Sequence, residues 1–276
     1  FPRNDARSEN AQEGRLAMNA GTEIEETRTR GRALPERPLL SCYFPLGDRQ
    51  VSPDLLDIYA GEGVDVIEIG MASPDPFLDG PDVRQSMLRA DRGRWRPDLD
   101  AVLERLAKFQ NPPRALLMTY ADPAHPGLHE KDLWRGLDSL LVVARADNPL
   151  ALRLERAAAD NGVALSPFVS LPLDEKAIER AREAGFYIML QAHAGATGPR
   201  ETLDPENADR IAQLRAAGAS RPILLGFGIS GGRQARQAME LGADGVIVGS
   251  QVLRAALAGG DALRMLLRDL RSGLDA

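Results

Sequence analysis

The sequence has one cysteine, no long apolar run and a net negative charge. Cys42 is the single cysteine among 276 residues, which excludes an intramolecular disulfide framework and is typical of a reducing compartment, so we expect a cytoplasmic protein. The apolar runs are much shorter than the roughly 20 residues that span a bilayer, so no membrane partner is expected. The formal net charge of -6 argues against the clustered basic face of a nucleic-acid-binding protein.

The first 36 residues differ in composition from the rest of the chain. Residues 1–36 are rich in Arg, Glu, Asn and Gly and have no sustained apolar period, so we predict a disordered N-terminal arm. A weak helix over residues 8–19 and a role in docking a partner are alternatives for this segment. Residues 37–276 are enough for one large domain with a substantial core.

Eight short apolar runs follow the arm and alternate with segments of helical apolar spacing. The runs are Leu39–Phe44, Val64–Gly70, Ala115–Tyr120, Ser139–Ala144, Val163–Val169, Tyr187–Gln191, Pro222–Gly226 and Gly245–Gly249. Strands that are apolar on both faces are typical of a parallel sheet covered by helices. Eight β-α units of this kind favour a single-domain (β/α)8 TIM barrel, with an open doubly wound sheet as the alternative.

One of the predicted strands contains a carboxylate. The segment Gly63–Gly70 repeats the pattern of Gly242–Gly249, except that Glu68 stands where the second segment has Ile247. A carboxylate in an apolar strand costs several kcal/mol unless it is paired or neutralised, so one interpretation is a Glu paired with a Lys or Arg. Residues near the C-terminal end of a barrel strand face the active-site mouth, and on this ground we predict a catalytic role for Glu68.

A loop rich in proline follows this strand. Residues 71–81 contain three prolines and a glycine, and this stiff loop carries Asp75 and Asp79 over the same mouth. Asp79 either caps the helix that starts near Pro81 or works with Glu68. Two carboxylates in different environments are the usual equipment for moving protons on and off a substrate.

Three glycine turns at consecutive strand ends predict a phosphate site. The turns are Gly195–Gly198, Gly226–Gly231 and Gly249-Ser250, and the last two precede helices whose N-terminal N–H groups attract anions. Gly226–Gly231 also reads as the dinucleotide fingerprint G-x-G-x-x-G, but no acidic residue ends the next strand, as that fingerprint requires. A monophosphate group on a small substrate fits better, in the place where barrels commonly bind phosphate.

Several further side chains are candidates for a pocket or a metal. Tyr43, Leu117, Tyr120 and Phe227 lie near strand ends, where they either line an aromatic substrate pocket or pack in the core. His125 and His129 are four residues apart, but Pro126 and Gly127 between them disfavour a helical metal pair, so no metal is predicted. His193 follows the sixth strand, either as a loop residue or facing the mouth.

The combined motifs resemble the tryptophan synthase α subunit family over about residues 38–256. The resemblance rests on Glu68-Ile-Gly, Asp75-Pro-x-x-Asp79-Gly-Pro81, Gly226-Phe-Gly-Ile-Ser230 and Gly242-Ala-Asp-Gly-Val-x-Val-Gly-Ser250. Further echoes are Tyr43-Phe-Pro-Leu-Gly-Asp48, Leu117-Met-Thr-Tyr120 and Ala194-Gly-Ala-Thr-Gly198. It implies a lyase that cleaves indole-3-glycerol phosphate to indole and glyceraldehyde 3-phosphate without a cofactor, either with a tryptophan synthase β subunit or alone.

The resemblance also implies residue roles. Glu68 would protonate indole C3 and help to remove the side-chain hydroxyl proton, and Asp79 would hold the indole N–H. The phosphate would bind to Gly198, Gly228, Ser230, Gly249 and Ser250. The substrate pocket would be formed by Tyr43, Leu117, Tyr120, Thr197 and Phe227.

Four segments depart from the family pattern and keep alternatives open, the first being the N-terminal arm, in which the family's short helix with its F-x-x-L pattern is not recognisable. The family loop P-F-S-D-P is Ala72-Ser-Pro-Asp-Pro76 here, the Asp-x-Pro turn after the fourth strand is replaced by Val143-Ala-Arg-Ala-Asp147, and S-R-x-G-V-T-G becomes Ala192-His-Ala-Gly-Ala-Thr-Gly198. These changes touch the lid, the pocket and the surface for a β partner. The alternatives are a lyase for a different aryl-glycerol phosphate, a catalytically silent regulatory partner of a pyridoxal-phosphate-dependent β subunit, and a related phosphate-binding isomerase.

Overall fold

All strands in the described part of the chain run parallel in one sheet. The computed structural model describes residues 33–145, 148–193 and 202–276. The strands are β1 (Leu39–Pro45), β2 (Val66–Gly70), β3 (Arg114–Tyr120), β4 (Ser139–Val143), β5 (Ala164–Leu165), β6 (Phe168–Val169), β7 (Ile188–Gln191), β8 (Ile223–Gly226) and β9 (Gly245–Val248). Their order in the sheet is β5-β4-β3-β2-β1-β9-β8-β7-β6.

The sheet closes into a ring through its fifth predicted strand. The structure divides the predicted strand Val163–Val169 into β5 and β6 at Ser166 and Pro167, because proline has no N–H for the ladder. β5 pairs with β4 and β6 pairs with β7, so the two parts of one extended segment stand at the two ends of the strand order. The predicted (β/α)8 barrel is therefore confirmed, and the open doubly wound sheet is wrong.

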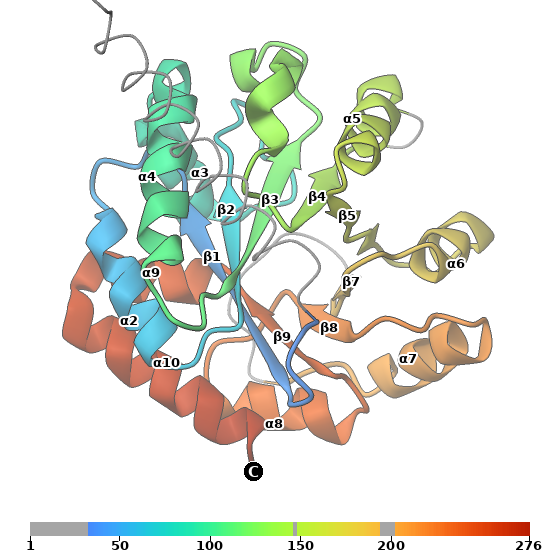
Figure 1. Cartoon of the computed structure of the whole chain (residues 1–276). Helices are drawn as coiled ribbons and strands as arrows, with labels where there is room; N and C mark the ends of the chain where they lie inside the picture. The colour runs from blue at the N-terminus through green and yellow to red at the C-terminus, as the bar shows by residue number, and fades with distance from the viewer. Residues whose placement is uncertain (1–32, 146–147, 194–201) are drawn as a thin grey trace, which may run out of the picture. The chain divides into compact units, whose positions relative to one another are not determined.

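The helices lie outside the strands, as Figure 1 shows. They are α2 (Leu56–Gly61), α3 (Pro81–Arg89), α4 (Trp95–Ala107), α5 (Pro149–Asp160), α6 (Glu175–Arg182), α7 (Asn207–Ala216), α8 (Gly232–Glu240), α9 (Ser250–Ala258) and α10 (Gly260–Leu274). In α4 the buried residues Leu99, Val102 and Leu106 recur at the helical spacing seen in the sequence. No helix in the described part of the chain is long and apolar enough to cross a membrane.

The connection between β3 and β4 contains short 3-10 turns in place of an α-helix. These are η3 (Pro126–His129) and η4 (Lys131–Trp134); η1 (Pro53–Leu55) and η2 (Arg92–Arg94) precede α2 and α4. Pro123 and Pro126 interrupt any α-helical hydrogen bonding at the start of this connection. Loops at this end of a barrel carry the site, so an irregular connection here shapes the mouth.

A repeated G-x-D motif organises the N-terminal ends of three strands. Each glycine has a positive φ, and each aspartate accepts a hydrogen bond from a backbone N–H of the neighbouring strand. In the first motif Gly63 has φ 80°, and Asp65 accepts from Leu40 N at 2.9 Å. In the second Gly136 has φ 78°, and Asp138 accepts from Ala115 N at 2.8 Å. In the third Gly242 has φ 88°, and Asp244 accepts from Ile223 N at 2.7 Å. The repeat of Gly63–Gly70 in Gly242–Gly249 thus contains a motif that binds the neighbouring strand at the N-terminal end of the barrel.

The aspartates of this motif are also paired with arginines. Asp65 is buried and forms ion pairs with Arg37 at 2.8 Å and with Arg271 at 3.2 Å. Asp138 pairs with Arg114 at 3.1 Å, and both side chains are buried. This end of the barrel lies opposite the mouth, where residues serve stability.

The predicted arm falls almost wholly outside the described residues. Residues 35–276 form one compact unit. The boundary between an arm over residues 1–36 and a barrel over residues 37–276 stays a prediction, as does the helix over residues 8–19.

Candidate active site

A cavity lies at the C-terminal ends of the strands. Its lining combines two carboxylates with apolar and aromatic side chains. The lining residues are Tyr43, Glu68, Leu78, Asp79, Val83, Met118, Tyr120, Leu141, Val143, Phe168, Met189, Phe227, Ile247 and Gly249. An enclosed apolar space with a few converging polar groups is the usual form of a small-molecule site.

Glu68 lies on the inner face of β2 and is almost completely buried. The hydroxyl of Tyr187 donates a hydrogen bond to Glu68 Oε1, and Ser41 Oγ lies 3.3 Å from the same hydroxyl. Within the described residues no Lys or Arg forms an ion pair with Glu68. The interpretation as a carboxylate neutralised by a basic neighbour is therefore wrong.

The surroundings of Glu68 bring its proton equilibrium close to neutral pH. Burial raises the pKa of Glu68 to about 7, the hydrogen bond from Tyr187 partly opposes this rise, and the negative charge of Asp79 adds to it. A carboxyl group with this pKa is present in both protonation states near pH 7. It can therefore both give and accept a proton in one catalytic cycle.

Asp79 stands at the end of the loop between β2 and α3. Its Oδ2 accepts a hydrogen bond of 2.6 Å from the hydroxyl of Tyr120, and its side chain is buried. The N-cap residue of α3 is Gly80, and no side chain caps this helix, so the interpretation of Asp79 as a helix cap is wrong. Burial raises the pKa of Asp79 to about 6, against the opposing effects of the Tyr120 hydrogen bond and the charge of Arg84.

Two arginines, Arg84 and Arg145, contact the loop that carries Asp79. Arg84 donates hydrogen bonds to the carbonyl oxygens of Asp79 (2.7 Å) and Phe77 (3.2 Å). Arg145, which follows β4, forms an ion pair of 3.0 Å with Asp75 and lies 4.3 Å from the centre of the Phe77 ring. Asp75 is exposed and does not line the cavity, so only one of the two loop aspartates faces the predicted mouth.

The predicted phosphate residues occupy different positions. Gly249 lines the cavity and is the N-cap residue of α9, and Ser250 is the first residue of that helix. Gly228 and Ser230 follow Phe227 in the turn after β8, and neither is among the lining residues. Gly198 and Thr197 lie outside the described residues.

The N-terminus of α8 already faces a carboxylate. The backbone N–H of Gly232 donates a hydrogen bond of 2.6 Å to Oδ2 of Asp269 in α10. The first N–H of α8 is thus hydrogen-bonded within the protein, and phosphate binding at Gly228 and Ser230 stays a prediction. Two candidates for the phosphate site are the N-terminus of α9 and the turn over Phe227 and Gly228. Phe227 (φ 74°) and Gly228 (φ 96°) both have positive φ.

Only some of the residues predicted to form the substrate pocket line the cavity. Tyr43, Tyr120 and Phe227 line the cavity, and Leu117 does not. Side chains alternate along a strand, and the lining residues Met118 and Tyr120 identify the inner face of β3, so Leu117 points toward the helix layer. The sequence places Leu117 near the strand end without fixing which face of the strand it occupies.

Tyr187 and much of the apolar lining of the cavity were not predicted from the sequence. Tyr187 is fully buried and bonds to Glu68, although 119 positions separate them in the chain. The alternation of inner residues contained this signal: Tyr187 and Met189 are two residues apart on the sixth predicted strand. Without the position of Glu68 across the barrel, this alternation did not distinguish a site residue from a core residue.

Two of the three histidines contact nearby backbone atoms, and the third lies at a separate groove. His125 Nδ1 accepts a hydrogen bond from Gly127 N at 3.1 Å, and burial lowers the pKa of His125 to about 4. His129 Nε2 lies 2.9 Å from the carbonyl oxygen of Pro123. In the part of the chain that the structure describes, no group of three or more His, Cys, Asp and Glu side chains is arranged to hold a metal ion.

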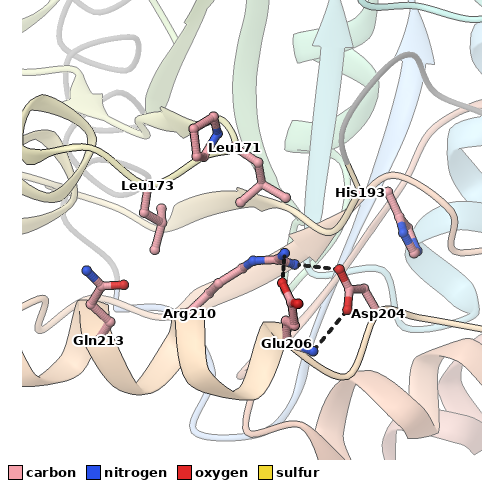
Figure 2. Close-up of a pocket in the computed structure, with 8 residues that line it drawn as sticks. Leu171, Leu173, His193, Asp204, Glu206, Arg210 and Gln213 are labelled. Carbon is pink, nitrogen blue, oxygen red and sulfur yellow. Dashed lines mark hydrogen bonds and ion pairs between the residues drawn. The ribbon is translucent and has the colours of Figure 1, made fainter.

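His193 lies beside a polar groove outside the cavity. Figure 2 shows Arg210 between two acidic partners in this groove, Asp204 at 3.0 Å and Glu206 at 2.7 Å. The remaining lining residues are Leu171, Pro172, Leu173 and Gln213. His193 is not among the residues that line the cavity containing Glu68 and Asp79.

Comparison with known proteins gives a consistent answer for most of the chain. A family model described as tryptophan synthase alpha chain matches residues 34–270. The chain belongs to this family. The tryptophan synthase alpha chain of Synechococcus elongatus is 34% identical over 229 residues, covering 78% of this chain and 82% of the relative. That of Vibrio vulnificus is 32% identical over 214 residues, covering 74% and 78%.

Solved structures of the family share the fold. The structure of Mycobacterium tuberculosis tryptophan synthase superposes with a TM-score of 0.74 at 26% identity, covering 87% of this chain and 93% of that chain. The tryptophan synthase alpha chain family assigned from the motifs is thus confirmed, and so is the barrel.

Proposed function

We propose that this protein is an indole-3-glycerol-phosphate lyase, a carbon–carbon lyase of tryptophan biosynthesis. Membership of the tryptophan synthase alpha chain family supports this function. The observation that carries it is the buried Glu68, which has no basic partner in the described residues and has a pKa raised to about 7, in a cavity that also contains Asp79. Paired carboxyl groups with raised pKa values are typical of acid–base sites.

We propose one orientation of the substrate in the site. We place the indole ring between the apolar side chains that line the cavity, with its N–H toward Asp79. The glycerol chain then runs past Glu68, and the phosphate lies at Gly249 and the N-terminus of α9. The helix dipole and the backbone N–H groups at a helix start stabilise a phosphate there.

In the proposed reaction Glu68 serves first as acid and then as base. Protonated Glu68 gives its proton to indole C3, and the ring nitrogen takes a positive charge. Ionised Glu68 then accepts the proton of the hydroxyl on the adjacent side-chain carbon. The bond from that carbon to indole C3 breaks, its electron pair restores the aromatic ring, and the oxygen becomes the aldehyde of glyceraldehyde 3-phosphate. One proton is given and one is taken, so the enzyme returns to its starting state.

Asp79 stabilises the charged intermediate. A fixed carboxylate beside the indole nitrogen lowers the energy of the positive charge most in a water-poor cavity, where the local dielectric is low. The hydrogen bond from Tyr120 holds Asp79 in that position. Glu68 and Asp79 therefore divide proton transfer and charge stabilisation between them.

The test is the release of indole from indole-3-glycerol phosphate by the purified protein. We expect Glu68→Gln to bind the substrate and to lose at least about 100-fold in kcat, a usual magnitude for an acid–base group. Near-normal turnover by Glu68→Gln would overturn the mechanism. A folded wild-type protein that releases no indole, with or without a tryptophan synthase β subunit, would overturn the function.

A tryptophan synthase β subunit is the proposed protein partner. The structures to which this chain is similar include Mycobacterium tuberculosis tryptophan synthase. Adding a β subunit to the lyase assay separates two modes of action: a large increase in kcat identifies an α subunit that needs its partner, and an unchanged rate identifies a self-sufficient enzyme. In either case the acid–base residues are the same.

The cytoplasm is the proposed location of the enzyme. The single cysteine, Cys42, is a free and fully buried thiol in β1, as suits a protein that does not depend on an oxidising compartment. Fractionation of cells that express the full-length protein tests this proposal, and recovery with the membrane or an extracellular fraction would contradict it.

A further inference from the structure

The hydroxyl of Tyr43 is a buried polar group on the cavity wall. Tyr43 lies on the inner face of β1, where its Cα is paired with that of Glu68 in β2. Its ring packs over Gly70: a Cβ at this glycine would lie 2.1 Å from Tyr43 Cε2 and 2.5 Å from the hydroxyl oxygen. Gly70 thus leaves room for the Tyr43 ring. The hydroxyl lies beside Gly70, which is two residues nearer the mouth along β2 than Glu68.

This hydroxyl differs from the other tyrosine hydroxyls of the site. Tyr120 donates to Asp79 and Tyr187 donates to Glu68. In the described residues the Tyr43 hydroxyl has no hydrogen-bond partner, although the residue is only 2% exposed. A phenylalanine would fill the same space without burying an unpaired polar atom. The hydroxyl therefore points to a ligand group that enters the cavity.

The chemistry of the substrate leaves one group for this hydroxyl. This step depends on the proposed function: the indole N–H is assigned to Asp79, the hydroxyl on the scissile carbon to Glu68, and the phosphate to the start of α9. The remaining polar group of indole-3-glycerol phosphate is the hydroxyl on the middle carbon of the glycerol chain. In the ring of strands β1 lies between β2, which carries Glu68, and β9, which leads to Gly249.

We propose that the Tyr43 hydroxyl binds the middle hydroxyl of the substrate's glycerol chain and so selects for a hydroxylated chain. The interaction lies between the reacting carbon and the phosphate, so it fixes the chain in the extended path from Glu68 to the mouth. Burial raises the pKa of Tyr43 well above its ordinary value, so the hydroxyl is neutral near pH 7 and can donate or accept a hydrogen bond.

The test pairs removal of the protein hydroxyl with removal of the substrate hydroxyls. Tyr43→Phe and wild type are compared with indole-3-glycerol phosphate and with indole-3-propanol phosphate, which has the same ring, chain length and phosphate but no chain hydroxyls. We expect Tyr43→Phe to raise KM for indole-3-glycerol phosphate about 5- to 10-fold, the effect of one neutral hydrogen bond, with a smaller change in kcat. The Kd of the propanol phosphate should be the same for both proteins.

Tyr59→Phe is the matched control. The Tyr59 hydroxyl is also buried, but it donates to the backbone carbonyl oxygen of Tyr43 at 3.2 Å and does not line the cavity. We expect this variant to keep the KM of the substrate and the Kd of the analogue. The pH dependence of kcat should be the same in Tyr43→Phe as in wild type, since the titration belongs to Glu68.

The outcomes separate this inference from the proposed function. Equal weakening of both ligands by Tyr43→Phe, or no weakening of either, would overturn the role of Tyr43 while the lyase assignment stands. A wild-type protein that binds neither ligand and releases no indole would overturn the proposed function itself.

Discussion

The Tyr120 hydroxyl donates a hydrogen bond of 2.6 Å to Oδ2 of Asp79, and this bond joins the last residue of β3 to the loop after β2. Phe77 of the same loop packs edge-on against the Tyr120 ring, with 5.3 Å between the ring centres. One tyrosine thus supports the loop by packing and fixes its carboxylate by a hydrogen bond. The position of Asp79 in the site is set by a strand distant in sequence.

Removing this hydroxyl should change the pH dependence of the reaction. The hydrogen bond from Tyr120 favours the ionised form of Asp79, so we expect Tyr120→Phe to raise the pKa of Asp79 above about 6. The acid limb of the kcat/KM profile then moves to higher pH, and the rate at pH 7 falls about 10-fold. Steady-state assays from pH 5 to pH 9 measure both effects. An unshifted acid limb would show that Asp79 does not need to be ionised.

Ionisation of Glu68 should destabilise the folded protein at high pH. Its pKa is raised from 4.5 to about 7 by folding, so the protonated form contributes stability that is fully present below pH 4.5 and is lost as the pH rises through about 7. The shift corresponds to a difference on the order of 3 kcal/mol. We expect Glu68→Gln to unfold at higher urea concentration than wild type at pH 8.5, with a smaller difference at pH 5. An equal difference at both pH values would contradict the raised pKa.

The contacts of Arg145 should matter more for catalysis than for stability. The ion pair of this exposed residue with Asp75 is solvated and contributes about 0–1 kcal/mol to folding, so Tm should change little in Arg145→Ala. Loss of the ion pair and of the Phe77 contact should loosen the loop that carries Asp79 and lower kcat/KM several-fold. Arg145→Lys keeps the charge but not the planar contact, and we expect an intermediate rate. A large fall in Tm with unchanged kcat/KM would contradict this prediction and show that Arg145 serves stability.

The opposite end of the barrel should show the reverse behaviour. Asp65 is a buried acceptor for Leu40 N–H and pairs with both Arg37 and Arg271. Asp65→Ala leaves these partners without their acceptor, and we expect a loss of about 3–5 kcal/mol in the free energy of unfolding. The kcat of the folded fraction should stay near that of wild type, because the site is at the other end of the strands. Urea unfolding with parallel assays at low temperature measures the two quantities separately.

The strands were predictable because their apolar runs are local signals. All eight predicted runs contain strands, and the break in Val163–Val169 follows from a property of Pro167 that is visible in the sequence. Glu68 was also predictable, since a single carboxylate in an apolar strand stands out against the matching position Ile247. Leu117 was misplaced because strand ends are easier to recognise than strand faces: a shift of one residue exchanges the cavity for the helix layer.

The sequence by itself determined the barrel, the carboxylate in its second strand and the family motifs, because periodicity and motif spacing are properties of neighbouring residues. Only the tertiary structure decided which groups meet. Tyr187 reaches Glu68 across the barrel, Tyr120 holds Asp79, and Asp269 takes the first N–H of α8. The raised pKa values of Glu68 and Asp79 follow mainly from burial, which is a result of closing the ring and is not encoded at any one position.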